Sequence, residues 1–367
     1  MATRRTSVRR IGVLTGGGDC PGLNAVIRAV AKTAMKDYGV EVLGIHDAFR
    51  GFVEGDARLL NWADLSGILT QGGTILGTSN KHDPFHFPVA TRGGEVFRDR
   101  SHKLLANARK WRLDAVVLIG GDGTMSAGHD LIQRGLPVVG VPKTIDNDLA
   151  ETDFTFGFDS AVATVTWAID KIHTTAMSHH RVMVIETMGR YAGWIALYAG
   201  VAGGGDVILI PELPYDLEKV CEVVRARNRT GKRFSIVVVA EGAKPKRGQM
   251  VVERRVQDSH DPIRLGGIGA KLAHDIETAA GIETRYTILG HLQRGGTPTA
   301  FDRVLATRFG VHAMELVAAG RFGRMACLKG QDVTSVPIAR AVACLKLVPR
   351  NHPVIKAARA VGTSFGI

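Results

Sequence analysis

The sequence predicts an α/β protein with mostly parallel sheets, and three observations support this fold class. Short runs of aliphatic and β-branched residues recur along the chain, among them RIGVLT, DAVVLI and RVMVIE. Glycine-rich turns follow several of these runs, and stretches with apolar residues three and four positions apart come next. Such alternation of strand and helix is typical of parallel sheets covered by helices on both faces.

The first expected element is a strand at 10–15, which the turn GGGDCPG joins to an amphipathic helix over 23–37. A long helix is expected to begin near residue 158, and two polar stretches, 79–95 and 241–267, are expected to be loops. The same reasoning predicts further strands at 41–46, 114–121, 137–142, 181–186, 206–211, 234–242 and 286–290.

Length and composition limit the class of protein. A chain of 367 residues suggests about two domains, and 45% hydrophobic with 22% charged residues is ordinary for a globular protein. No run approaches the ~18 apolar residues of a membrane helix, and the basic start MATRRTSVRR is not followed by a signal-peptide core. We therefore expect a cytoplasmic protein that does not contact membranes.

The net charge of +12 includes four arginines of a basic N-terminal tail, and the remaining excess could serve nucleic acid or small polyanions. Aromatic residues make up only 6%, and no stretch combines basic and aromatic residues as single-strand binding proteins do. This pattern favours phosphorylated small molecules over nucleic acid. Metal-ligand spacing is also missing: Pro84 separates His82 from His86, which indicates a surface loop. Reduced, structural thiols are expected at Cys20, Cys221, Cys327 and Cys344.

Two glycine-rich turns, Gly16–Gly18 and Gly120–Gly123, come where predicted strands end and helices begin. Backbone N–H groups and the helix dipole attract phosphate at such positions. Either turn alone could be an ordinary tight turn, but the two together indicate a polyphosphate ligand. Neither turn has the spacing of a P-loop or of a dinucleotide-binding motif.

Carboxylates near these turns indicate the chemistry. Asp146 and Asp148 flank Asn147 just past the strand at 137–142. In isolation such a pair is usually a solvated turn, but with Asp122 inside a glycine turn it suggests Mg²⁺-assisted phosphoryl transfer. On this hypothesis Asp122 is the metal carboxylate and Asp146 the general base. Asp148 supports the metal or the orientation, and Arg190 stabilises the charge of the transferring phosphoryl group.

A set of motifs spanning about residues 10–325 resembles the 6-phosphofructokinase family. A lone GGDGT would also fit NAD kinases and diacylglycerol kinases, so the resemblance depends on the whole series in order. The motifs are GVLTGGGDCPGLNAVIR, GGTILG, IGGDGT, PKTIDND, TFGFDSA, SHHRVMVIETMGRYAGW, VAEG and ETRYTILGHLQRGGTPTAFDR.

The resemblance implies two Rossmann-like, three-layer αβα domains with the active site in the cleft between them. The implied donor domain is 8–157 plus about 293–344, and the implied sugar-phosphate domain is 158–292 plus about 345–367. Residues 1–7 would be a flexible basic tail. The implied reaction is the glycolytic phosphorylation of fructose 6-phosphate at its 1-hydroxyl by ATP or pyrophosphate, with Mg²⁺ as cofactor.

The resemblance also implies site residues. Asp146 would remove the proton of the 1-hydroxyl beside Thr144 and Asp148, while the Gly18 backbone and Arg190 would stabilise the phosphoryl group. The implied donor contacts, with Asp122 at the metal, are Gly17, Gly18, Lys81, Gly121, Asp122, Gly123, Thr124 and Lys143. The implied sugar-phosphate contacts are Thr144, Asp146, Asp148, Arg181, Met188, Gly189, Arg190, Glu241, Arg285, His291 and Arg294.

In the family, Arg181 and Arg285 reach the 6-phosphate from a neighbouring subunit. This implies a homodimer or homotetramer with shared active sites. Planar guanidinium groups also suit a phosphate dianion on chemical grounds. Arg28 and Lys32 stand where bacterial relatives bind an effector, although exposed basic residues on a helix are usually only solvated.

Two positions give opposite indications about the donor. Gly123 is typical of ATP-using members and leaves room for the α-phosphate, whereas Lys143 is typical of pyrophosphate users. We give Gly123 more weight, because a carboxylate there would exclude ATP directly while a lysine can move aside. A further departure is Asn80, which replaces an arginine of the bacterial ATP enzymes, with Lys81 as a substitute. The remaining alternatives are an NAD or lipid kinase and a non-catalytic subunit that senses sugar phosphate.

Overall fold

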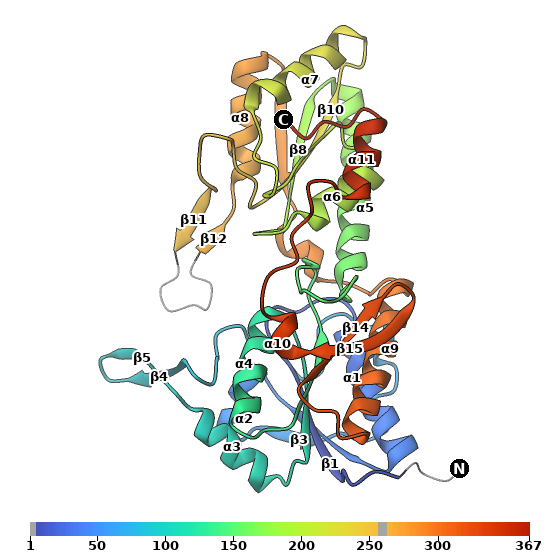
Figure 1. Cartoon of the computed structure of the whole chain (residues 1–367). Helices are drawn as coiled ribbons and strands as arrows, with labels where there is room; N and C mark the ends of the chain where they lie inside the picture. Colours follow the sequence, from blue (N-terminus) through green and yellow to red (C-terminus); the bar gives the residue numbers. More distant parts are fainter. Residues whose placement is uncertain (1–4, 256–262) are drawn as a thin grey trace. The chain divides into compact units, whose positions relative to one another are not determined.

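The structure, a computed structural model, describes residues 5–255 and 263–367, which form two compact units (Figure 1). The first unit takes in the described chain up to Thr144, together with Leu149–Asp159 and Arg294–Leu345. The second unit comprises Ile145–Asp148, Ser160–Gln293 and Lys346–Ile367. Ile145–Asp148 thus group with the second unit, although the boundaries expected from the sequence put them in the first.

The first unit is built on a seven-stranded sheet with the order β15-β14-β7-β6-β1-β2-β3. Neighbouring strands from β14 to β2 pair in parallel, and the two edge strands, β15 and β3, pair antiparallel. The strands are β1 (Arg10–Thr15), β2 (Glu41–Ile45), β3 (Ala57–Leu59), β6 (Ala115–Gly120), β7 (Val138–Pro142), β14 (Arg324–Lys329) and β15 (Asp332–Pro337).

Helices cover both faces of this sheet. Successive strand side chains point to opposite faces, and Leu14, Val116, Leu118 and Val138 share a buried cluster with α2, α3, α4 and α10. Helices α1 and α9 pack together on the other face (Figure 1). The helices are α1 (Leu23–Thr33), α2 (Phe49–Glu54), α3 (Ser101–Lys110), α4 (Asp122–Gln133), α9 (Ala300–Ala318) and α10 (Ile338–Ala341).

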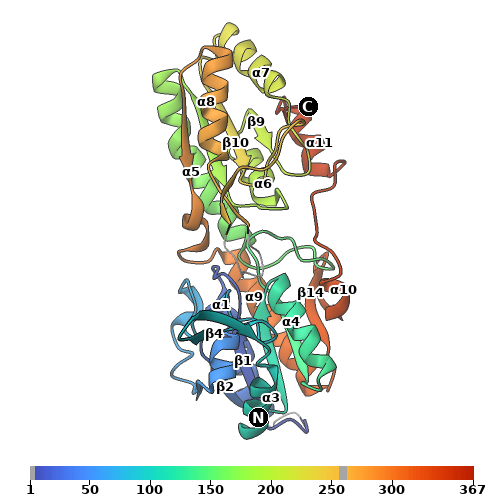
Figure 2. The same cartoon turned by 90° about the vertical axis from the view of Figure 1, so that its left-hand side faces the viewer.

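The second unit contains a four-stranded parallel sheet with the order β13-β8-β10-β9. Alternate strand residues, such as Val184, Leu209 and Val237, form one buried cluster with α7 and α8. Helix α11 packs beside α6 (Figure 2). The elements are α5 (Phe158–His179), β8 (Val182–Thr187), α6 (Trp194–Ala202), β9 (Val207–Leu209), α7 (Leu217–Arg229), β10 (Ser235–Ala240), α8 (Ile268–Ala280), β13 (Thr284–Ile288) and α11 (Pro353–Ala360).

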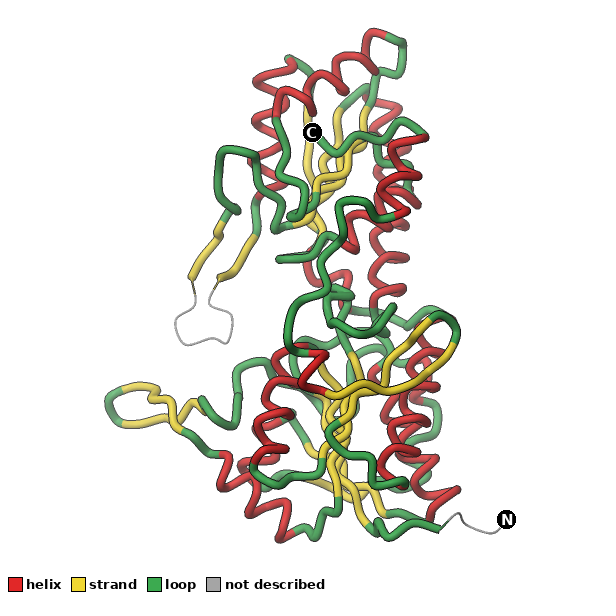
Figure 3. Tube along the Cα trace, viewed as in Figure 1, coloured by secondary structure: helices red, strands yellow, loops and turns green. Residues whose placement is uncertain are grey.

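The predicted α/β class with mostly parallel sheets is confirmed, with local differences. The stretches expected to be loops at 79–95 and 241–267 contain strands of two antiparallel hairpins, which Figure 3 shows in yellow. They are β4 (Phe87–Thr91) with β5 (Gly94–Arg98), and β11 (Val252–Arg255) with β12 (Ile263–Leu265). The expected helix over 23–37 is α1 followed by a π-helical turn, Ala34–Tyr38. Among the described residues, no helix is both long and apolar enough to cross a membrane.

The strand order fixes where a ligand is expected. After β1 the chain passes through α1 to β2 on one side, whereas after β6 it passes through α4 to β7 on the other side. The carboxyl ends of β1 and β6 therefore form a topological switch point, where open α/β sheets bind their ligands. In the second sheet, β8 leads away toward β9 and β10 leads back to β13, so a second switch point lies between β8 and β10.

Candidate functional site

The two glycine turns of the first unit meet at the switch point between β1 and β6. The N–H group of Gly16 donates to the carbonyl oxygen of Ile119 at 2.9 Å, which joins the two strand ends. The buried side chain of Thr124 lies against both turns. A Cβ atom on Gly120 would be 2.3 Å from Thr124 Cβ, and one on Gly16 would be 2.6 Å from Thr124 Oγ1. Glycine is required at both positions because Thr124 fills the space.

Two cationic side chains bind the carbonyl oxygens of the turn after β1. Lys143, which is buried, donates from Nζ to the carbonyl of Gly18. Arg294 donates from Nη1 to the carbonyl of Asp19 at 3.0 Å. Burial lowers the pKa of Lys143 from its ordinary value. Two basic side chains therefore hold the carbonyl oxygens of this turn, and the guanidinium of Arg294 is permanently cationic, which suits a polyanionic ligand.

Other predicted donor residues lie around the same strand ends. Asp122 is exposed in the first turn of α4, after Gly121 and before the partly buried Gly123. The first turn of a helix presents N–H groups without helical partners, so this position can bind phosphate. Lys81 is exposed on the loop whose Ser79 carbonyl accepts from the N–H of Gly17 at 3.0 Å.

The loops after β8 and β10 form the corresponding place in the second unit. Met188, Gly189 and Arg190 follow β8, and Glu241 and Gly242 follow β10. The N–H of Glu241 donates to the carbonyl of Thr187 at 2.8 Å, and that of Gly242 donates to the carbonyl of Gly189 at 3.2 Å. The two loops are therefore held together by backbone hydrogen bonds beyond the ends of the strands.

Three charged side chains of the second unit interact in this region. Burial, and after it the negative charge of Asp146, raise the pKa of Glu241 to about 7, while the positive charge of Arg190 opposes this shift. The structure thus brings Asp146, Arg190 and Glu241 into one electrostatic environment. A protonatable carboxyl that titrates near neutral pH beside a second carboxylate is typical of an active site.

This shift predicts a pH-dependent stability difference between the wild-type protein and Glu241→Gln. The fold favours the protonated form of the Glu241 carboxyl. This group therefore makes its full contribution to the free energy of unfolding below its ordinary pKa of 4.5, and the contribution is lost as the pH rises through about 7. The free energy of unfolding of the wild type should therefore fall relative to the variant, by up to roughly 3 kcal/mol between about pH 4.5 and 8.

Denaturant unfolding across that pH range measures this difference. The control is Glu95→Gln, because Glu95 is exposed on β5. A difference between the wild type and Glu241→Gln that stays constant with pH would contradict the raised pKa.

The loop that carries Asp146 has alternating burial. Ile145 and Asn147 are buried, while Asp146 and Asp148 are partly exposed. Thr144, which precedes the loop, belongs to the first unit, where its carbonyl accepts from Thr155 Oγ1 at 2.6 Å. The two carboxylates are therefore partly accessible on either side of a buried asparagine.

Two of the arginines expected at the 6-phosphate lie together, at the end of the second sheet opposite to Glu241. Arg181 and Arg285 both pair with Glu283, at 3.0 Å and 2.7 Å, at the amino ends of β8 and β13. Met188 follows the opposite end of β8, and seven residues of extended chain span roughly 23 Å. Arg181 and Arg285 are thus separated from Glu241 of the same chain by the length of the sheet.

His291 and Arg294 belong to the short 3₁₀ turn Gly290–Arg294, where His291 is exposed. Arg294, for which the family resemblance implies a sugar-phosphate contact, groups with the first unit and donates to the carbonyl of Asp19. Sequence reasoning missed Gln293, which is fully buried in the same turn. Its Oε1 accepts from the N–H of Met188 at 3.2 Å, and its Nε2 donates to the carbonyl of Gly290 at 3.0 Å. In the sequence, only the place of Gln293 inside the motif HLQRGG could have indicated that it supports the loop after β8.

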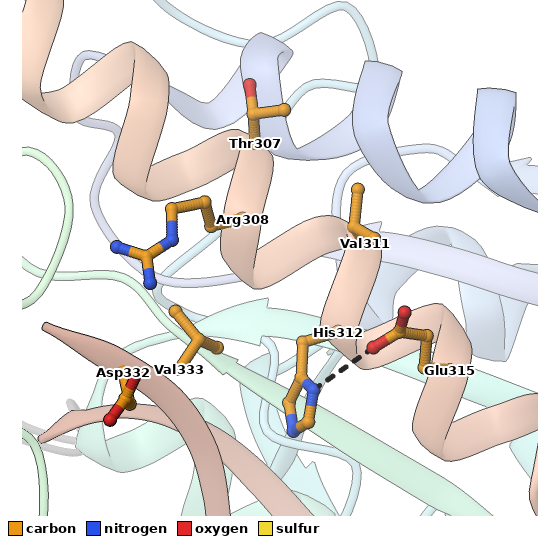
Figure 4. Close-up of a pocket in the computed structure, with 7 residues that line it drawn as sticks. All are labelled: Thr307, Arg308, Val311, His312, Glu315, Asp332 and Val333. Carbon is orange, nitrogen blue, oxygen red and sulfur yellow. Dashed lines mark hydrogen bonds and ion pairs between the residues drawn. The ribbon is translucent and has the colours of Figure 1, made fainter.

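A separate groove of about 380 Å³ lies between α9 and β15 (Figure 4). His312 Nδ1 and Glu315 Oε2 are 3.3 Å apart on its wall. None of the residues expected in the active site contributes to it. The lining residues are Thr307, Arg308, Val311, His312, Glu315, Asp332 and Val333.

Among the residues that the structure describes, no group of three or more His, Cys, Asp or Glu side chains could hold a metal ion. The cysteines expected to be reduced are free thiols, with Cys20, Cys221 and Cys327 buried and Cys344 exposed. Burial raises the pKa of Cys20 to about 12, so this thiol is neutral beside the turn after β1.

Comparisons with known proteins agree with this arrangement. Residues 10–317 match the family described as phosphofructokinase. The ATP-dependent 6-phosphofructokinase 2 of Clostridium perfringens is 50% identical over 360 residues, with 98% of each chain covered. The pyrophosphate–fructose 6-phosphate 1-phosphotransferase of Streptomyces coelicolor is 51% identical over 340 residues, with 92% of this chain and 96% of the relative covered.

A solved structure of phosphofructokinase from Saccharomyces cerevisiae aligns with a TM-score of 0.75 and 31% identity. The alignment covers 91% of this chain and 45% of the longer yeast chain. The match to the phosphofructokinase family extends over both units. It therefore excludes the NAD and lipid kinases, which the motif GGDGT alone would allow. The chain therefore belongs to the phosphofructokinase family.

Proposed function

We propose that the protein transfers the γ-phosphoryl group of ATP to the 1-hydroxyl of fructose 6-phosphate, giving ADP, fructose 1,6-bisphosphate and a proton. The observation that carries this proposal is the shared environment of Asp146, Arg190 and Glu241 at the strand ends of the second unit. Membership of the phosphofructokinase family supports the substrate assignment. In this proposal the first unit binds the donor and the second unit binds the sugar phosphate.

The donor is proposed to bind at the switch point between β1 and β6. The N-terminus of α4 and the turn after β1 supply N–H groups, and Lys143 and Arg294 supply positive charge behind that turn. Mg²⁺ usually binds through one or two carboxylates together with substrate phosphates and water. Exposed Asp122 fits such a site, and no larger group of protein ligands is required. When bound, the metal would neutralise charge on the phosphates.

Asp146 is proposed to accept the proton of the 1-hydroxyl while the oxygen attacks the γ-phosphorus and the bond to the β-phosphate oxygen breaks. Arg190 is proposed to stabilise the negative charge of the transferring group, because its guanidinium is permanently cationic. Glu241, with Met188 and Gly189, is proposed to bind the sugar hydroxyls. Thr144 and Asp148 would orient the acceptor on either side of the base.

The 6-phosphate is proposed to bind across a subunit boundary. Arg181 and Arg285 lie at the far end of the sheet from Glu241, so these arginines would serve the site of a neighbouring subunit. Exposed apolar side chains near them support an interface, because Tyr286 is 51% and Ile288 is 48% exposed on the edge strand β13. We propose a homodimer or homotetramer with shared active sites, in which His291 completes the phosphate contacts.

Two residues bear on the choice of donor, since relatives named for either donor are about equally similar to this chain. Gly123 adds no side chain in the first turn of α4. Lys143 is engaged with the carbonyl of Gly18, so its ammonium group has a role in supporting the turn. Both observations favour ATP over pyrophosphate.

Enzyme-coupled assays of fructose 1,6-bisphosphate formation with ATP or pyrophosphate test the proposed function. Turnover with ATP is expected to dominate, and Gly123→Asp should lower kcat/KM for ATP by about 100-fold because the added carboxylate repels the α-phosphate. The same variant assayed with pyrophosphate is the control. Turnover with pyrophosphate alone would contradict the donor assignment. No turnover with either donor would favour a subunit that only senses sugar phosphate.

A further inference from the structure

We infer that Lys346 is a positioning residue for the Asp146 carboxylate and acts through Asn147. The inference rests on the proposed function, because it concerns the general base of that reaction. Lys346 is the first residue of the C-terminal segment that belongs to the second unit, Lys346–Ile367. It therefore enters the site from a part of the chain that carries none of the site residues expected from the sequence.

Lys346 binds the two residues that follow Asp146. Its backbone N–H donates to the carbonyl of Asp148 at 2.7 Å. Its side-chain Nζ donates to Asn147 Oδ1 at 2.8 Å. One residue thus fixes both the main chain and a side chain of the catalytic loop, so a displacement of Lys346 would be passed directly to the loop.

The backbone at Asn147 needs such support. Its φ angle is 51°, in the left-handed region, where asparagine is tolerated but costs free energy relative to an extended or helical conformation. The side chain is also 2% exposed, so its amide requires hydrogen-bond partners inside the protein. The ammonium of Lys346 supplies one of them. Because the φ of residue 147 sets the direction of the preceding peptide group, this contact influences where Asp146 points.

Lys346 is itself fixed by Trp194, the first residue of α6, which follows the loop that carries Arg190. Its carbonyl accepts from Trp194 Nε1 at 2.8 Å, and its Nζ lies 5.4 Å from the centre of the Trp194 ring. Two residues further on, the N–H of Val348 donates to Glu212 Oε1 at 2.8 Å, and the same carboxylate accepts from the N–H of Gly193 at 3.1 Å.

The C-terminal segment therefore connects the loop of the proposed base to the loop of the proposed charge-stabilising arginine. Gly193 and Trp194 come three and four residues after Arg190, whereas Asn147 and Asp148 come directly after Asp146. Lys346 is the residue common to both sets of contacts. Its role is to hold the base in a fixed relation to Arg190, and its removal should affect the chemical step more than sugar binding.

Steady-state kinetics of Lys346→Met, Asn147→Gly and the double variant test this role. Lys346→Met is expected to lower kcat by about 10- to 100-fold, the size expected for a misplaced catalytic group, with KM for fructose 6-phosphate within about threefold. Asn147→Gly keeps the left-handed backbone without strain but loses the acceptor, so its effect should be similar. Both changes remove the same contact, between Lys346 and Asn147. The kcat of the double variant should therefore be no lower than that of the less active single variant.

Controls separate this role from general destabilisation. Lys356→Met alters an exposed lysine of α11 in the same segment and should leave kcat unchanged. Lys346→Arg keeps a cation and should recover part of the kcat that Lys346→Met loses. If Lys346→Met does not fold, Lys346→Arg and Asn147→Gly are compared with the wild type instead. Multiplicative effects in the double variant, or a Lys346→Met kcat within twofold of the wild type, would overturn the inference. An inactive wild-type protein would instead overturn the proposed function.

Discussion

Asp146→Asn is expected to lower kcat by about 1,000-fold, because an amide of the same size cannot accept the proton of the 1-hydroxyl. The affinity for fructose 6-phosphate should stay within about threefold, since the loop keeps its shape and Asp146 is proposed to act in the chemical step. Coupled assays give kcat, and titration calorimetry with fructose 6-phosphate gives the affinity.

A second effect of Asp146→Asn follows from the electrostatics of the second unit. The charge of Asp146 is one cause of the raised pKa of Glu241, so the variant should lower that pKa. The pH-dependent fall in unfolding free energy assigned to Glu241 should then occur at lower pH. Asp130→Asn, on an exposed residue of α4, is the matched control. A kcat within tenfold of the wild type would exclude Asp146 as the base.

Gly242→Ala is expected to lower the free energy of unfolding by roughly 3 kcal/mol or more and kcat by about 100-fold. A Cβ atom at position 242 would lie 1.8 Å from the carbonyl oxygen of Arg190 and 3.0 Å from that of Gly189. Both contacts are with backbone, which cannot rotate away as a side chain can. The loops after β8 and β10 would have to separate, and Arg190 and Glu241 would move with them.

Denaturant unfolding and steady-state kinetics on the same preparations measure both effects. The control is Gly93→Ala, because a Cβ atom at Gly93 would meet nothing within 4 Å. If Gly242→Ala were as stable as this control, the two loops could not be packed as the structure has them.

The sequence was sufficient for most of the parallel core, but it missed the buried strand β14 and the exposed strands. Strands such as β6 and β10 are buried along their whole length and appear as continuous apolar runs. The β4–β5 hairpin was missed because few of its residues are buried and Pro88 argues against a strand. Strand β13 begins two residues earlier than expected, since its exposed edge position leaves little apolar pattern to mark its start.

Only those residues of the candidate site that belong to sequence motifs could be predicted. Asp146, Arg190 and Glu241 come from three segments of the chain, and the structure brings them into one electrostatic environment. The contact between Lys346 and Asn147 joins residues 199 positions apart, and neither residue belongs to a local pattern that indicates the other. The binding of Arg294 to the carbonyl of Asp19 was equally unpredictable, because an arginine beside glycines fits a phosphate ligand or a backbone carbonyl alike.

The proposed reaction requires the Asp146 carboxylate to accept the proton of the sugar's 1-hydroxyl. A crystal structure of the protein with fructose 6-phosphate and a non-hydrolysable ATP analogue measures this relation directly. We predict that an Oδ atom of Asp146 lies within about 3 Å of the 1-hydroxyl oxygen, close enough to accept its proton. A separation that neither a hydrogen bond nor a single bridging water could span would contradict the claim.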